Sequence, residues 1–176
     1  MSGIDDALSA NERYEHTFNL ANLPMPPARK LAIVACMDAR LTVEQFLGLK
    51  TGDAHIIRNA GGIVTEDVLR SLIISHHLLG TQEFMIVNHT DCGMLTFKDQ
   101  ELAEKLEKST NTSPVAPSRF YSFTDLDSNV RQQIQRVKAH PWIPKHIPVR
   151  GFVYDVKTGA LREVVAVTTP QTQTAR

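Results

Sequence analysis

The chain has 176 residues, of which 42% are hydrophobic, and its 19 basic residues balance 19 acidic ones. This length suits a single domain with a sizeable core. The charge balance gives no reason to expect a nucleic acid or a membrane surface as partner, and no apolar run approaches the roughly 18 residues of a membrane helix. Because residues 1–13 also lack the basic start of a secretory signal, we expect a cytoplasmic protein with reduced cysteines.

Residues 1–28 are predicted to form a helical arm followed by a proline-rich tether. On a helix, Ile4, Leu8, Tyr14 and Phe18 fall within an arc of roughly 120°, and three prolines then separate the arm from the rest of the chain. Such a stripe either packs on its own domain or embraces a second subunit. Both arrangements stay open.

Residues 29–167 are predicted to form one zinc-binding α/β domain, and residues 168–176 a disordered tail. Short apolar runs predict buried parallel strands, and apolar residues at spacings of three and four predict helices. Thr42 and Gln45 are interpreted as a capping box at the start of a short helix. The predicted strands are 31–36, 54–58 and 83–88, the helices are 42–47, 65–79, 99–108 and 125–140, and 149–156 with 160–167 form a closing hairpin. The fold class is therefore α/β, with a mostly parallel sheet flanked by helices and an antiparallel edge strand.

The only two cysteines, Cys36 and Cys92, lie where predicted strands give way to loops, and His89 precedes the second by three residues. Two thiolates and one imidazole form a three-ligand set for one Zn²⁺ and leave a fourth position open, which is typical of a catalytic metal. The carboxyl ends of parallel strands share one edge of the sheet, so these residues are expected to meet. A Cys36–Cys92 disulfide is the alternative, which a reducing cytoplasm disfavours.

Asp38 and Arg40 follow the first proposed ligand closely. A carboxylate and a guanidinium at this spacing are able to pair bidentately, which would keep Asp38 ionised and aim an oxygen toward a water on the metal. Both are predicted to be catalytic. An ordinary surface ion pair is the alternative.

The segment from Arg58 to Gly62 follows another predicted strand. Its paired glycines permit a close backbone approach or a positive φ. We predict that Arg58, Gly61 and Gly62 contribute to substrate binding, although an ordinary turn would also explain the motif.

These motifs resemble those of the β-class carbonic anhydrases. Cys36, Asp38 and Arg40 match the family's Cys-x-Asp-x-Arg segment, and His89 with Cys92 matches its His-x-x-Cys segment. The resemblance is strong over residues 31–97 and implies zinc-dependent hydration of carbon dioxide, with Asp38 orienting the nucleophile and Arg40 holding Asp38. It also implies a homodimer or a dimer of dimers.

Some positions depart from the commonest family pattern. Met37 and Ala39 stand where serines are common, and with Met94 they are closer to a short-chain branch that includes carbonyl sulfide and carbon disulfide hydrolases. Hydrolysis of carbonyl sulfide or carbon disulfide is therefore an alternative function. A zinc-stabilised binding module without catalysis is a lesser alternative, with Asp38 as its fourth ligand.

Overall fold

A five-stranded sheet with the order β2-β1-β3-β4-β5 forms the centre of the molecule. The computed structural model describes residues 2–113 and 116–165. Four strands run parallel, and β5 pairs antiparallel with β4 at one edge. The strands are β1 Leu31–Cys36, β2 Ala54–Asn59, β3 Glu83–His89, β4 Val149–Tyr154 and β5 Leu161–Val164. The predicted α/β class and the antiparallel edge are confirmed.

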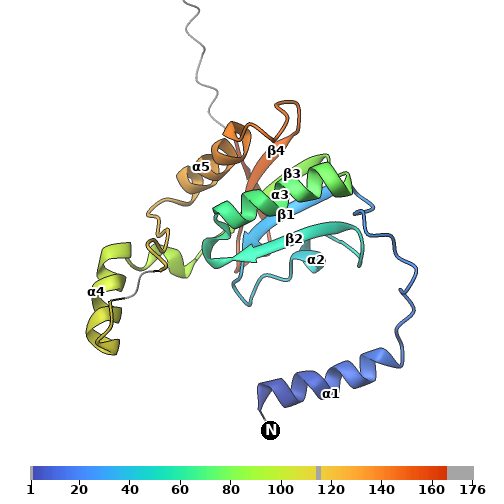
Figure 1. The fold of residues 1–176 in the computed structure, drawn as a ribbon, viewed down its shortest axis with the longest axis horizontal. Coiled ribbons are helices and arrows are strands. Elements are labelled where there is room, and N and C mark those ends of the chain that lie inside the picture. Colours follow the sequence, from blue (N-terminus) through green and yellow to red (C-terminus); the bar gives the residue numbers. More distant parts are fainter. Residues whose placement is uncertain (1, 114–115, 166–176) are drawn as a thin grey trace, which may run out of the picture.

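Helices of unequal size cover the two faces of the sheet (Figure 1). Helices α3 and α5 lie on one face and enclose the larger core with β1, β3 and β4. The short α2 covers the other face, where Val43 is buried beside Ile33 and Val87. The helices are α1 Gly3–Glu15, α2 Val43–Phe46, α3 Glu66–Leu79, α4 Asp99–Thr110 and α5 Leu126–Ala139, with two 3₁₀ turns, η1 Ala60–Gly62 and η2 Gly93–Leu95.

The helix boundaries follow local capping where a side chain is available for it. The hydroxyl of Thr65 accepts a hydrogen bond from Val68 N at the start of α3, and Gly80 ends that helix in the left-handed conformation. Asp125 caps α5 in the same way through Ser128 N. The predicted capping box at Thr42 is wrong, because Thr42 precedes α2 without any side-chain cap. Burial of Val43, rather than capping, anchors this single turn.

The arm stands apart from the sheet and is joined to it by an extended segment (Figure 1). Helix α1 contains no buried residue. It ends at Glu15, so the prediction that Phe18 continues the helical stripe is wrong, although the rings of Tyr14 and Phe18 still lie 5.7 Å apart. The arm therefore does not pack on its own domain, which removes one of the two alternatives for its stripe.

Four further expectations concern the chain as a whole or its ends. Within the described residues, no helix is both long and apolar enough to cross a membrane. The cytoplasmic location stays a prediction, as do the domain boundaries. The tail 168–176 lies outside the described residues.

Candidate metal centre

The strand order places the three candidate ligands at one point of the sheet. Strand β1 pairs with β2 on one side and with β3 on the other, so the chain reverses its direction of winding between β1 and β3. Ligands bind at such a switch point, beyond the carboxyl ends of the strands. Cys36 ends β1, His89 ends β3, and Cys92 follows after a two-residue turn. Their ligand atoms all lie within 4.8 Å of one another, and all three residues are buried.

His89 is oriented so that one ring nitrogen faces the two sulfurs. Its Nδ1 lies 2.8 Å from the carbonyl oxygen of Thr90, and because a carbonyl only accepts, Nδ1 carries the hydrogen. Nε2 then presents a lone pair. Among residues 2–113 and 116–165, this Nε2 is the one buried side-chain nitrogen or oxygen without a hydrogen-bond partner. A metal ion would satisfy it, since ligating histidines usually donate their other N–H to such an acceptor.

The protonation of the three groups also suits a cation. A hydrogen bond from the Cys92 thiol stabilises the Cys36 thiolate and outweighs burial, so the pKa of Cys36 is lowered. Cys92 keeps its proton as the donor in this contact, which raises its pKa. Burial alone would lower the pKa of His89, but the adjacent thiolate outweighs burial and raises it. Both cysteines are free, so the disulfide alternative does not describe this structure. A metal takes the place of protons held between such donors, and the residues therefore fit a zinc ion.

Asp38 sits beside these donors in a fixed orientation. Arg40 donates to Asp38 from Nε to Oδ1 at 2.9 Å and from Nη2 to Oδ2 at 2.8 Å. These bonds hold the pKa of Asp38 well below its usual range, so the carboxylate stays ionised at neutral pH. Its Oδ2 lies 3.7 Å from His89 Nε2. The bidentate pair expected from the sequence is present, and it faces the candidate metal position.

Asp91 is a second carboxylate on the same guanidinium, and sequence reasoning missed it. Arg40 donates from Nη1 to Asp91 Oδ2 at 2.8 Å and from Nη2 to the Asp91 carbonyl at 2.9 Å. Asp91 adopts a φ of 56°, a left-handed conformation that aspartate tolerates better than most residues. The acidic residue within the His-x-x-Cys segment was the available signal. Arg40 thus ties the loop after β1 to the loop after β3.

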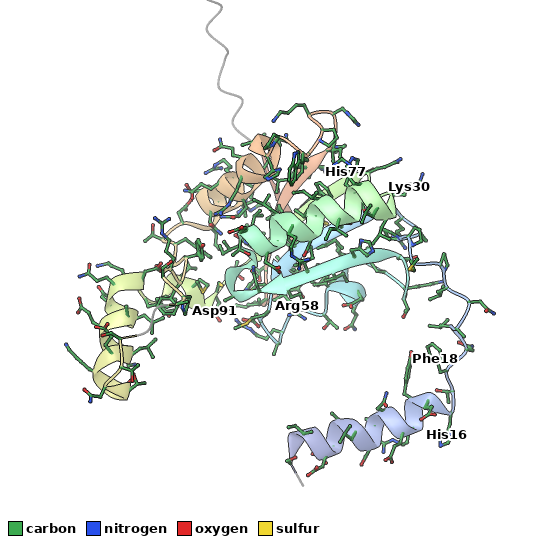
Figure 2. The ribbon with its side chains drawn as sticks, in the orientation of Figure 1. His16, Phe18, Lys30, Arg58, His77 and Asp91 are labelled. Carbon is green, nitrogen blue, oxygen red and sulfur yellow. The ribbon has the colours of Figure 1, made fainter. Side chains whose placement is uncertain are left out.

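Arg58 supports the first of these loops from the neighbouring strand. Its guanidinium donates to the Cys36 carbonyl from Nε at 2.9 Å and to the Asp38 carbonyl from Nη2 at 2.6 Å. Figure 2 shows Arg58 and Asp91 near the carboxyl ends of β2 and β3. The bonds of Arg58 therefore hold backbone. Its predicted contact with substrate stays a prediction.

Gly61 and Gly62 occupy different surroundings despite being adjacent. Gly61 has a φ of 80° and donates its N–H to Cys36 Sγ at 3.3 Å. Gly62 lies against the carboxyl-terminal parts of β1 and β3, where a Cβ would come within 3.0 Å of the Val87 carbonyl oxygen. Close backbone approach and a φ of 62° together account for Gly62, while Gly61 faces the candidate site.

A pocket of about 360 Å³ opens beside the donors. Its walls combine the donor loops with apolar side chains, and it has room for a small linear molecule. The lining residues are Cys36, Met37, Asp38, Ala60, Gly61, Cys92, Gly93, Met94, Thr96 and Phe97. Of the predicted substrate-binding residues, Gly61 lines this pocket, and Arg58 and Gly62 lie outside its lining.

Comparisons with known proteins agree with this geometry. The family model described as carbonic anhydrase matches residues 31–161. Beta-carbonic anhydrase 1 of Mycobacterium tuberculosis is 49% identical over 164 residues, which cover 93% of this chain and 99% of that protein. A carbon disulfide hydrolase of Saccharolobus solfataricus is 37% identical, covering 91% of this chain and 88% of that protein.

A solved structure shows the same fold. The crystal structure of a carbonic anhydrase from Streptococcus mutans superposes with a TM-score of 0.88 and 46% sequence identity, covering 94% of this chain and 99% of that chain. The expected similarity to a branch that holds both carbonic anhydrases and carbon disulfide hydrolases is confirmed.

Proposed function

Because the chain belongs to the carbonic anhydrase family, we propose that it catalyses the reversible hydration of carbon dioxide to bicarbonate and a proton, with one zinc ion held by Cys36, His89 and Cys92. The observation that carries the proposal is the meeting of these three donor atoms within 4.8 Å, beside a carboxylate held by Arg40. When bound, zinc would supply the Lewis acidity that makes a water molecule nucleophilic near neutral pH.

Asp38 is the residue of this chain that would orient the nucleophile. An ionised carboxylate only accepts hydrogen bonds, and both Asp38 oxygens already accept from Arg40. The remaining lone pairs would accept a hydrogen of the nucleophilic water and turn its lone pair toward the substrate carbon. Arg40 holds Asp38 in this orientation, and its second ion pair with Asp91 fixes the guanidinium itself.

The pocket supports a small apolar substrate. Met37, Met94 and Phe97 form an apolar part of its lining, beside polar residues such as Asp38 and Thr96. Carbon dioxide is uncharged and would be held by contacts with these apolar side chains, whereas bicarbonate is charged and would be released to water.

The Asp38→Ala variant tests the catalytic assignment. We expect turnover of carbon dioxide to fall by about 100-fold or more, as for loss of a proton-handling group, while zinc content stays at one per chain. Stopped-flow hydration and elemental analysis measure the two quantities. Loss of zinc together with turnover would instead identify Asp38 as a fourth ligand and favour a non-catalytic zinc module.

Carbonyl sulfide and carbon disulfide are the rival substrates, since a carbon disulfide hydrolase is among the relatives. Parallel assays of the three gases on one zinc-loaded preparation separate the alternatives. We expect carbon dioxide to have the highest kcat/KM. A higher value for either sulfur compound would overturn the substrate assignment and leave the zinc site intact.

We also propose that the arm binds a second copy of the chain, giving a homodimer or a dimer of dimers. The apolar side chains of Ile4, Leu8, Tyr14 and Phe18 are 73%, 60%, 52% and 49% exposed. The first three of these residues lie on helix α1, which has no buried residue, and Phe18 follows the helix. Exposed apolar side chains that gather in this way need another surface to cover them, and homo-oligomers supply such surfaces by symmetry.

A further inference from the structure

Three buried amide side chains connect helix α5 to the η1 turn. Asn88, Asn129 and Gln133 are 1%, 4% and 6% exposed. Gln133 Nε2 donates to Asn129 Oδ1 at 2.8 Å, Asn129 Nδ2 donates to Asn88 Oδ1 at 2.7 Å, and Asn88 Nδ2 donates to the Gly61 carbonyl at 2.9 Å. At the other end, Val64 N donates to Gln133 Oε1 at 2.9 Å. The amide chain of Asn88, Asn129 and Gln133 thus begins and ends on one short backbone segment, residues 61–64.

Both ends of the amide chain have a fixed polarity. The Val64 N–H only donates and the Gly61 carbonyl only accepts, so every amide between them has one possible orientation. Each link orients the next. Breaking one link in the buried interior would leave donors and acceptors without partners, and hence the neighbouring amides would reorient.

Gly61 is the point where the amide chain approaches the candidate metal centre. Its N–H donates to Cys36 Sγ. Its φ is 80°, and a Cβ at this position would lie within 3.0 Å of Met94 Cγ, so a larger residue would not fit without adjustment. Asn59 holds the same turn from the other side, but its side chain binds Ile63 rather than Gly61. Asn88, and through it α5, therefore holds the Gly61 carbonyl, which only the φ and ψ of Gly61 separate from the N–H that contacts Cys36.

We propose that Asn88, Asn129 and Gln133 are positioning residues that hold the Gly61 N–H against Cys36 Sγ, and so tune the sulfur as a metal ligand from a helix that contributes no ligand. The inference rests on the proposed zinc binding by Cys36. Hydrogen bonds to a ligating sulfur reduce the charge that it donates to the metal, and groups that orient ligands affect metal affinity. Loss of the Gly61 contact would leave Cys36 as a stronger electron donor that is less firmly held.

The test compares two amide variants with a matched core variant on the full-length, metal-loaded protein. Asn129→Leu removes the two central bonds, to Gln133 and to Asn88. Gln133→Met removes the two outer bonds, to Val64 and to Asn129. Val130→Ala shortens a buried apolar residue of the same helix and removes none of these hydrogen bonds. Each is loaded with cobalt(II) to record the thiolate-to-metal charge-transfer absorption, and with zinc to measure the rate of zinc loss to a chelator.

We expect Asn129→Leu to shift the charge-transfer band and to increase the rate of zinc loss by about tenfold. Gln133→Met should change both in the same direction by less, because Asn129 still donates to Asn88 Oδ1 and so still orients the amide that binds Gly61. Val130→Ala should lower the melting temperature without moving the band. This graded order would distinguish positioning from a general loss of stability.

The proposal is overturned if the amide variants match Val130→Ala in both measurements. Should Asn129→Leu fail to fold, Gln133→Met alone decides, since an unchanged band and rate in that variant are sufficient to reject the inference. Failure of the wild-type protein to bind either metal would instead reject the proposed function.

Discussion

The carboxyl ends of β1 and β3 and the N-terminal arm differ in how their side chains find partners. At the strand ends, guanidinium, carboxylate and amide groups from several segments bind one another around the candidate ligands. The arm has a capped helix, with Ser2 and Asp5 in a capping box, but nothing in the described chain covers its apolar stripe. Figure 2 shows Phe18 on the arm, away from the sheet. In the first region the buried polar side chains of the described residues find partners within the chain, with His89 Nε2 as the exception, whereas helix α1 of the second region buries no residue against its own domain.

The strongest challenge to the self-contained region is removal of one ligand. In Cys92→Ser a hydroxyl replaces the thiolate, and a neutral hydroxyl is a poor zinc ligand. We expect zinc content near zero and no measurable hydration of carbon dioxide. Elemental analysis and stopped-flow assays check this, with circular dichroism to show that the chain is folded. Retention of one zinc per chain would contradict the assignment of Cys92.

Removal of the arm tests the opposite region. A chain lacking residues 2–23 should shift toward the monomer, because α1 buries none of its residues against its own domain and its apolar stripe is free to hold a second copy. Light scattering coupled to size-exclusion chromatography measures the mass. A double substitution, Ile4→Ser with Leu8→Ser, should have the same effect on a full-length chain. An unchanged mass for both would show that the arm does not hold copies together.

A smaller effect is expected at the carboxylate that sequence reasoning missed. Asp91→Asn removes the charge facing Arg40 Nη1. Because exposed ion pairs contribute little, we expect kcat/KM to fall by only about two- to fivefold, with zinc content unchanged. Glu163→Gln is the matched control, since Glu163 pairs with Arg150 at the far edge of the sheet, and it should leave kcat/KM unaltered. If the two substitutions changed kcat/KM equally, the assignment of Asp91 to the candidate site would be wrong.

The smallest effect concerns the loop of residues 120–123, whose Phe123 lies beside Gly61 and Met94. Asp99 accepts hydrogen bonds from the backbone N–H groups of Phe120, Tyr121 and Ser122, and the next residue, Phe123, binds the Met94 carbonyl. Partial burial raises the pKa of Asp99, but the bonds from this loop outweigh burial and lower it. Ionised Asp99 therefore stabilises the fold above its unfolded pKa of about 3.9, and this contribution is lost as the pH falls through the lower folded value.

Asp99→Asn should accordingly lower the free energy of unfolding by about 1–2 kcal/mol at pH 7. The difference from wild type should stay constant down to about pH 5 and narrow below about pH 4. Denaturant titrations at several pH values measure it. Asp67→Asn removes the same charge from an exposed pair with Arg70 and should have little effect at any pH. A difference that grows on acidification would contradict the stabilising role of the ionised carboxylate.

The sequence was sufficient where local chemistry decides the structure. The runs at β1 and β3 are continuous and apolar because both faces of a parallel strand are covered, so their positions were recognised almost to the residue. The donors were found because reactive residues at strand ends are rare and parallel strands share an edge. The spacing of apolar residues in α3 likewise reflects its packing on the sheet.

Most of the errors and omissions concern contacts between segments that are distant in the sequence, and the end of the arm helix is the exception. Thr42 has the sequence of a cap, but burial of Val43 determines that turn. Phe18 fits the helical period, yet the helix ends before it. Asp91 itself adopts the left-handed conformation, and in this conformation its carboxylate contacts Arg40. Asn129 and Gln133 did leave a signal, because two amides one turn apart lie on the buried face of a helix.

The dependence of Gly61 on α5 has a consequence for the order in which the protein is made. Cys36, His89 and Cys92 emerge from the ribosome before residues 126–139, so a growing chain already carries every donor while the helix that orients Gly61 is still being synthesised. If the amide chain acts as proposed, a metal captured at that stage meets a sulfur lacking its final hydrogen bond. Tight and selective retention would then begin only when α5 docks on the sheet, which links acquisition of the metal to completion of the fold.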